Sequence, residues 1–173
     1  MYSKENLLLQ RIQKTETELI KCRLIRDVIS SCTYEYLEEP NCQFYNDRSG
    51  LDYADWIKYY NKTPSEDTGP ESAIGGKYYM YIETSTMNSG QNARLISSLL
   101  STDTQLCLSF YYHMFGDSIG ELQVIINTPG SNQIIFRKSN SQGNYWHYKQ
   151  LFLQPASQFQ QDLRNADIAL SSN

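Results

Sequence analysis

A serine between two glycines is the residue of this chain whose setting most suggests covalent chemistry. The pentapeptide Gly116-Asp117-Ser118-Ile119-Gly120 could present a hydroxyl on a tight turn, where it would attack an ester or amide carbonyl. A serine nucleophile needs a histidine base within hydrogen-bond reach and a third group that orients the histidine. The pentapeptide also joins a strand-like run that contains Phe110 to one that starts at Leu122, which favours a polar turn over a nucleophile.

The same pentapeptide resembles the nucleophile block of GDS-type esterases and, more distantly, that of trypsin-like proteases. The esterases supply their base from a late Asp-x-x-His segment, whereas here His147 follows Asn144 at that spacing. The esterase block also stands early in an α/β fold, which this chain does not suggest. We therefore predict no catalytic residues and no enzymatic activity, with an esterase that acts through Ser118 as an alternative.

Metal and cofactor chemistry has little support in the residues themselves. The chain contains no CxxC pair, so its four cysteines lack the spacing of a zinc site. It also lacks the HExxH, P-loop and dinucleotide-binding motifs. The acidic pairs Glu38-Glu39 and Glu66-Asp67 are expected in solvated loops, since catalysis by two carboxylates needs a fixed separation. These observations predict no cofactor.

Composition argues against nucleic acid and points to protein partners. The chain has 173 residues, a net charge of −4 and 14 tyrosines. Residues 1–31 hold six Lys or Arg against four Asp or Glu, which leaves the remainder acidic. Binding to a phosphate backbone needs clustered Lys and Arg, so we expect no nucleic-acid partner. Tyrosine combines an apolar ring with a polar tip and is common on half-buried strands and on binding surfaces.

Residues 1–31 are predicted to form an amphipathic helical extension. Apolar residues recur there mostly at helical spacing and no Gly or Pro interrupts them, namely Leu8, Ile12, Leu19, Ile20, Leu24 and Val28. The helix could serve oligomerisation or docking, or act only as a spacer, which we favour. The N-terminus has no apolar segment typical of a signal peptide, and no run is long enough to span a bilayer. We therefore expect membrane attachment only through a parent protein.

Residues 32–173 are predicted to form one β domain. Strand-like runs alternate with Gly-rich turns, as in a β-sandwich or barrel. Strands are expected at residues 78–83, 106–114, 122–126, 133–136 and 146–153, with a turn over 127–132 and a polar loop over 65–76. Two antiparallel sheets stacked face to face are the simplest arrangement at this size. The expected core residues are Trp56, Trp146 and Phe110.

An ordered set of blocks makes this domain resemble the MAM family. The blocks are Cys32-Thr33-Tyr34-Glu35, Cys42, Asp55-Trp56, residues 76–83, Ala93-Arg94-Leu95, residues 107–116, Trp146 and residues 167–170. The resemblance implies an all-β antiparallel β-sandwich of jelly-roll type. It also implies a non-catalytic adhesion or protein-recognition module that is extracellular or at the cell surface and makes homophilic or heterophilic contacts.

The resemblance further assigns roles to the cysteines. It implies a disulfide between Cys32 and Cys42, which would close a small loop and contribute about 2.5–3 kcal/mol. It leaves Cys107 unpaired, because the usual partner lies after the last strand and the chain ends at Asn173 before such a residue. Cys22 matches no cysteine of the family and is also expected to be unpaired. Four reduced thiols in an intracellular protein are the alternative.

Calcium and an N-linked glycan are the ligands that the sequence suggests. Some MAM domains hold a cation in acidic loops, and Glu35 and Asp67 best match those positions. Calcium takes six to eight oxygen ligands, and Ser171-Ser172 replaces the acidic pair that closes the family pattern, so the ligand set is incomplete. Asn61 begins the sequon Asn61-Lys62-Thr63, which Pro64 follows.

About one strand of the family pattern is expected to be absent between Phe159 and Asp167. Loss of a strand would open a sheet edge, so we expect reduced stability. The binding face is expected near Tyr59-Tyr60 or in the loop of residues 65–75. An accessory domain of a protease or receptor whose catalytic part lies elsewhere is one alternative function, and a carbohydrate-binding jelly roll is another.

Overall fold

The computed structural model of the chain describes residues 44–84, 87–102, 106–153, 156–165 and 169–171. These residues form the strands β1 (Phe44–Asn46), β2 (Ile57–Tyr59), β3 (Tyr79–Tyr81), β4 (Ala93–Ser97), β5 (Leu100–Thr102), β6 (Leu106–Met114), β7 (Glu121–Thr128), β8 (Ser131–Ser139), β9 (Gly143–Leu153), β10 (Ala156–Asn165) and β11 (Ala169–Ser171). The predicted helix over residues 1–31 lies outside the described residues, as do Cys22, Cys32, Glu35 and Cys42.

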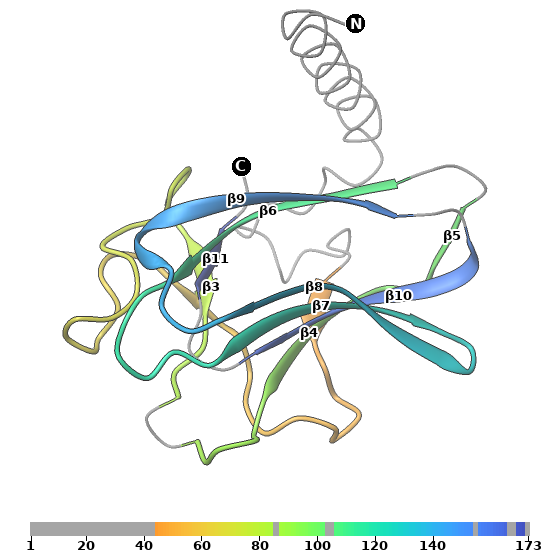
Figure 1. Ribbon diagram of the computed structural model, residues 1–173, viewed down its shortest axis with the longest axis horizontal. Coiled ribbons are helices and arrows are strands. Elements are labelled where there is room, and N and C mark those ends of the chain that lie inside the picture. Colours follow the sequence, from red (N-terminus) through yellow and green to blue (C-terminus); the bar gives the residue numbers. More distant parts are fainter. Residues whose placement is uncertain (1–43, 85–86, 103–105, 154–155, 166–168, 172–173) are drawn as a thin grey trace, which may run out of the picture.

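Two antiparallel sheets stack face to face (Figure 1). The six-stranded sheet has the order β1-β4-β10-β7-β8, with β5 paired to β10, and the five-stranded sheet has the order β2-β3-β11-β6-β9. The described residues contain no helix, and none of them forms a helix long and apolar enough to cross a membrane. This confirms the predicted all-β antiparallel sandwich of jelly-roll type.

The core lies between the sheets and follows the alternation of their strands. Successive side chains of a strand point to opposite faces, so every second residue of β6 faces the core: Leu108, Phe110, Tyr112 and Met114. Phe110 is 3% exposed and Trp56 is 2% exposed, and both belong to this core. Trp146 points to the other face of β9, because its neighbour His147 stacks on the core residue Tyr112. On that face Trp146 is half-buried and packs against a second hydrophobic cluster, which contains Tyr79 and Tyr81.

The β7–β8 hairpin is tighter than the predicted turn over residues 127–132. Asn127 pairs with Asn132 and Thr128 pairs with Ser131, so the turn contains only Pro129 and Gly130. Gly130 has a φ of 83°, which a residue without a Cβ atom adopts at little cost. The Pro-Gly pair thus marks the turn correctly, while the polar residues on either side continue the ladder.

The last two strands occupy central positions in the sandwich. β10 lies between β4 and β7, and β11 lies between β3 and β6. Residues 160–165 of β10 pair with β7, and residues 162–165 also pair with β4 on the other side. β11 has only three residues and pairs with residues 111–113 of β6, so residues 106–110 of β6 pair with β9 alone among the described strands. The expected open edge and the reduced stability stay predictions.

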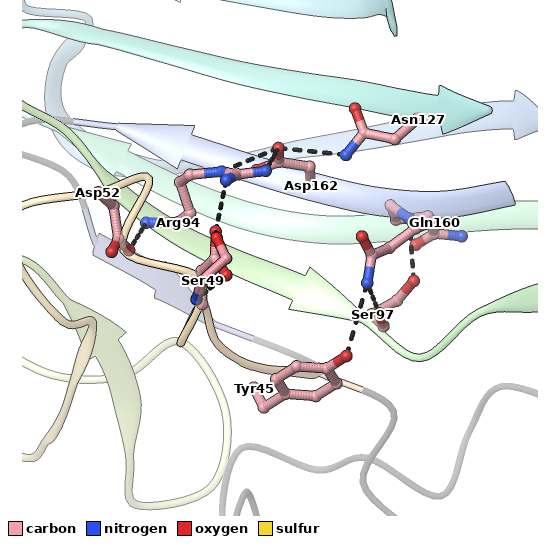
Figure 2. A network of polar contacts seen from close by, with 10 residues as sticks. Tyr45, Ser49, Asp52, Arg94, Ser97, Asn127, Gln160 and Asp162 are labelled. Carbon is pink, nitrogen blue, oxygen red and sulfur yellow. Dashed lines mark hydrogen bonds and ion pairs between the residues drawn. The ribbon is translucent and has the colours of Figure 1, made fainter. Parts of the chain in front are cut away.

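A buried ion network fixes the loop after β1 onto the six-stranded sheet (Figure 2). Arg94 on β4 is 6% exposed, and its guanidinium bridges the carboxylates of Asp47 and Asp162. Its Nη2 lies 2.7 Å from Asp162 Oδ2 and its Nε lies 3.2 Å from the same oxygen. Burial acts to lower the pKa of Arg94, but the hydrogen bond and charge of Asp162 outweigh it, so the pKa is raised. The network ties residues 47–55 to the outer face of the sheet, since Leu95 beside Arg94 faces the core.

Candidate functional site

Three connecting segments meet at one end of the five-stranded sheet. β3 and β6 both pair antiparallel with β11, so they run in the same direction and end at the same edge of the sheet. The segment after β3, the turn after β6 and the loop of residues 60–76 come together there. They enclose a groove of about 550 Å³, a volume typical of small-ligand sites. We refer to this feature as the end groove.

The end groove combines polar groups with an apolar wall. Its apolar wall consists of the half-buried residues Met87, Phe115 and Ile119. The carboxylate residue Glu83 also lines the groove. Tyr81 donates its hydroxyl to Glu83 Oε2 at 3.1 Å. Burial, followed by the charge of Glu83 and this hydrogen bond, raises the pKa of Tyr81 to about 12. Tyr81 therefore keeps its proton at physiological pH and fixes the Glu83 carboxylate.

His113 is buried beside the end groove, with 2% of its surface exposed. The rings of Phe115 and Trp146 contact it edge-on, with centroids 6.4 and 5.5 Å away. Its Nε2 lies 3.1 Å from Asn144 Oδ1, an oxygen that only accepts, so Nε2 carries the proton and Nδ1 is an acceptor. No described residue donates to Nδ1. Burial lowers the pKa of His113 to about 4, against the smaller opposing effect of the Asn144 bond.

This buried histidine predicts a loss of stability in acid. The pKa of His113 is about 4 in the folded state and 6.5 in the unfolded chain. Between these values the unfolded state binds more protons, so the free energy of unfolding decreases as the pH is lowered. At pH 5 we expect the loss from this residue to be about 2 kcal/mol. Urea unfolding of the wild type and of His113→Gln at pH 7 and pH 5 measures it, because the variant should lose about 2 kcal/mol less over this interval. Equal losses in both proteins would contradict the assignment.

Ser118 lines the end groove, and none of the described residues serves it as a base. It is exposed, in the turn between β6 and β7 that the sequence predicted. His113 Nδ1 has no hydrogen-bond partner among the described residues, so it does not bond to the Ser118 hydroxyl. The other histidine, His147, has its Nε2 3.1 Å from the carbonyl oxygen of Gln142 and its ring stacked on Tyr112. The described residues therefore do not activate Ser118 as a nucleophile.

A second candidate site, the tyrosine–lysine surface, consists of Lys58, Tyr60, Lys77 and Tyr78. It lies beside β2, an edge strand. The Nζ atom of Lys58 is 4.5 Å from the ring centroid of Tyr78, and that of Lys77 is 5.1 Å from Tyr78 and 5.5 Å from Tyr60. Tyr60 is 48% exposed, and both lysines are exposed. Exposed cation–π contacts contribute about 0.5–1 kcal/mol each, so they help to hold these side chains in place.

The tyrosine–lysine surface is adjacent to a second aromatic cluster on the outer face of the five-stranded sheet. Tyr79 is fully buried there and Tyr59 packs against it. The Tyr79 hydroxyl donates to the carbonyl oxygen of Asn61 at 2.8 Å, and the Trp146 indole donates to that of Ser72 at 3.0 Å. These bonds attach the loop of residues 60–76 to the sheet, so both candidate sites have a fixed support.

Comparison with known families decides the class of the domain. The family profile described as MAM domain, meprin/A5/mu, matches residues 32–167. The chain belongs to the MAM family. This confirms the resemblance that the blocks between Cys32 and Leu170 indicated.

Several MAM proteins are similar to this chain over only a small part of their length. MAM domain-containing glycosylphosphatidylinositol anchor protein 1 of Gallus gallus is 34% identical over 143 residues, which cover 76% of this chain and 15% of that protein. Thyroid hormone-induced protein B of Xenopus laevis is 34% identical over 123 residues, which cover 66% of this chain and 17% of that protein. Among solved structures, the K1 cleaved adhesin domain of Lys-gingipain from Porphyromonas gingivalis W83 has a TM-score of 0.46 at 11% identity, covering 75% of this chain and 90% of that one.

The calcium ligands expected from the MAM resemblance are only partly described. Asp67 is exposed in the loop of residues 60–76, with a φ of 54°, whereas Glu35 lies outside the described residues. Within the part of the chain that the structure describes, no group of three His, Cys, Asp or Glu could hold a metal ion. The calcium site therefore stays a prediction.

The sequon and the cysteines of this MAM domain also stay predictions. Asn61 is exposed, so its side chain is accessible. Its backbone has a φ of 68°. Thr63 is 6% exposed and donates to the Thr68 carbonyl oxygen at 2.9 Å, so this residue of the sequon has a structural role of its own. Cys107 lies in β6, but its side chain is outside the described part.

Sequence reasoning found part of the candidate sites. It named Tyr59-Tyr60 but missed the lysines, although a Lys-Tyr-Tyr triplet occurs at residues 58–60 and again at residues 77–79. The two triplets lie beside each other because β2 pairs with β3. It also missed Glu83 and His113, which no short motif connects and which the sheet brings to one groove.

Proposed function

We propose that this MAM domain is a non-catalytic recognition module that binds a protein partner outside the cell or at the cell surface, and so supports adhesion. The observation that carries the proposal is the tyrosine–lysine surface. Tyr60 and Tyr78 are in edge-on contact at 6.0 Å and are flanked by two exposed ammonium groups. Tyrosine offers rigid contact area at a low cost in conformational entropy.

The chemistry of this surface favours an acidic protein partner. Tyrosines are enriched at the centres of protein interfaces and lysines are depleted there, so we place Tyr60 and Tyr78 at the centre and Lys58 and Lys77 at the rim. Rim charges accelerate encounter with a partner of opposite sign. β2 has only three residues and carries a lysine, features that discourage addition of a foreign strand. The partner is therefore expected to contact side chains.

The parent protein determines what the contact achieves. The chain spans about 15% of the length of the relatives that are similar to it, so the activity of a whole protein is a separate proposal. We propose that this domain has an accessory role in it, because the described residues do not supply Ser118 with a base. Oligomerisation through residues 1–31 stays a prediction.

A multivalent binding screen tests the proposal. The full chain, produced by secretion and displayed on beads, would be exposed to a panel of cell-surface ectodomains and to beads that carry the chain itself. We expect saturable binding to at least one ectodomain or aggregation of the beads, weakened by salt because the rim is charged. Binding to neither, by protein with a cooperative unfolding transition, would contradict the proposal.

An oxidising compartment is a separate expectation of the same proposal. A non-reducing peptide map of the secreted chain should show the Cys32–Cys42 bridge, because structural disulfides persist outside the cytosol. Four free thiols in folded protein would contradict the extracellular assignment and favour an intracellular role.

A further inference from the structure

The outer face of the five-stranded sheet carries no charge where β6 and β9 pair. The strands β3, β11, β6 and β9 together contain one lysine, Lys149, and no arginine, aspartate or glutamate. The Nζ atom of Lys149 lies 5.4 Å from the ring centroid of the core residue Phe136, so this lysine is on the opposite face. Burial lowers the pKa of His113 to about 4, which keeps it neutral at physiological pH. A ligand on this part of the sheet therefore meets neutral side chains.

A pair of tyrosines is open to solvent on this face. Tyr111 of β6 is directly opposite Tyr148 of β9, and their ring centroids are 5.0 Å apart at an angle of 48°. Their neighbours in sequence, Tyr112 and His147, stack on each other at the core side, so the alternation of the strands places Tyr111 and Tyr148 outward. Tyr148 is 43% exposed and Tyr111 is half-buried. The pairing of two strands thus fixes an accessible aromatic surface.

Neutral polar groups lie beside the tyrosine pair. The next outward position of the ladder pairs Ser109 with Gln150, and both residues are half-buried. On the other side of the pair, the loop of residues 60–76 is attached to the sheet, because the Trp146 indole donates to the carbonyl oxygen of Ser72 at 3.0 Å. The pair therefore lies between this loop and a hydroxyl and an amide that can donate and accept hydrogen bonds. We call this set the tyrosine–glutamine face: Ser109, Tyr111, Tyr148 and Gln150.

The chemistry and size of the tyrosine–glutamine face favour a neutral sugar. A pyranose ring has a face of C–H groups, which packs on the electron-rich face of an aromatic ring, and a rim of hydroxyls, which bond to amides and hydroxyls. A charged ligand would find no counter-charge here. A stable protein interface buries about 800 Å² on each partner. One aromatic side chain supplies at most about 250 Å², and both tyrosines are partly covered, so a small ligand fits better.

We propose that the tyrosine–glutamine face binds a neutral glycan through one of its hexose residues. The more exposed ring, that of Tyr148, stacks on the C–H face of the sugar, and Gln150 and Ser109 bond to its hydroxyls. This site uses none of the residues of the tyrosine–lysine surface. It adds glycan recognition to the protein recognition proposed above.

Titration of the ¹⁵N-labelled chain with lactose, cellobiose and maltose, followed by backbone amide shifts, tests this inference. We expect saturable shifts at Tyr111, Tyr148 and Gln150 with at least one of these sugars. For that sugar, Tyr148→Ala should weaken binding about tenfold or more, whereas Tyr148→Phe keeps the ring and should retain most of it. Gln150→Ala should weaken binding roughly threefold. Tyr53→Ala removes a tyrosine that is 69% exposed in another segment and should leave binding unchanged.

Three results would overturn the inference. The first is the absence of saturable shifts with all three sugars, in protein with a cooperative unfolding transition. The second is equal binding by the wild type and Tyr148→Ala, which would place the sugar elsewhere. The third is a set of shifts at the same amides that depends on the concentration of the chain without sugar, which would make this face a contact between copies. None of these results involves the tyrosine–lysine surface, so the glycan site can fail while the proposed function stands.

Discussion

Replacement of Arg94 by alanine is expected to lower the free energy of unfolding by about 3–5 kcal/mol. Its guanidinium is shared by Asp47 and Asp162, and the side chains of all three residues are at most 7% exposed. Removal of the cation leaves two carboxylates without their counter-charge in a buried site, where loss of one partner costs more than the ion pair contributes. Asp47 also caps the loop after β1 by accepting from the Ser49 amide at 2.9 Å. We expect this loop to detach from β4 in the variant.

Arg48→Ala is the matched control for Arg94→Ala. Arg48 also pairs with an aspartate, Asp55, at 2.9 Å, but the two side chains are 73% and 45% exposed. An exposed pair of this kind contributes about 0–1 kcal/mol. Chemical unfolding of the wild type, Arg94→Ala and Arg48→Ala should therefore give clearly different free energies of unfolding for the two variants. A loss below about 1 kcal/mol for Arg94→Ala would show that the network is hydrated in solution and does not hold the loop.

Trp56→Ala is expected to cost about 3–5 kcal/mol. Trp56 is 2% exposed and is the largest fully buried side chain of the core. It lies just before β2, where its backbone amide donates to Asn46 Oδ1 at 2.8 Å and its carbonyl accepts from Asn46 Nδ2 at 3.0 Å. Asn46 belongs to β1 of the other sheet, so these bonds hold the indole in place between the layers. The alanine variant would leave a cavity, and the two sheets could close it only by breaking the hydrogen bonds between Asn46 and the backbone of residue 56.

Tyr53→Ala is the control for Trp56→Ala. Tyr53 lies in the same connecting segment and is 69% exposed, so its loss should change stability by less than about 0.5 kcal/mol. Trp56→Phe should retain much of the stability, because it keeps an aromatic ring and removes an indole N–H that has no hydrogen-bond partner among the described residues. A thermal melt in which Trp56→Ala matches Tyr53→Ala would contradict the placement of Trp56.

The regular strands were predictable from the sequence because their signals are local. The predicted strand over residues 106–114 coincides with β6, since its alternating apolar residues face the core. Other boundaries were less accurate: β9 begins at Gly143, three residues before Trp146. Hydrogen bonding across to β6 extends it, and pairing of this kind leaves no trace in the residues of one strand.

The contacts that build the candidate sites were not predictable from local pattern. Asp47 and Asp162 are 47 and 68 positions from Arg94, and no motif connects them. Glu83 and His113 reach one groove only because β3 and β6 both pair with β11. The face of β9 on which Trp146 lies was not predictable either. The residues around Trp146 alternate in polarity in a way that is compatible with both faces, and the stacking of His147 on Tyr112, a contact between strands, fixes the orientation.

Reversal of the charges on the tyrosine–lysine surface tests most directly whether this surface is the recognition face. Lys58→Glu/Lys77→Glu would be compared with the wild type in the bead assay, together with Arg137→Glu/Lys138→Glu on β8. The control has the same change of net charge but lies on an edge strand of the other sheet. We predict that reversal of Lys58 and Lys77 weakens binding about tenfold or more, while the control keeps most of it. Equal binding by the wild type and the Lys58→Glu/Lys77→Glu variant would contradict the assignment of the tyrosine–lysine surface as the recognition face.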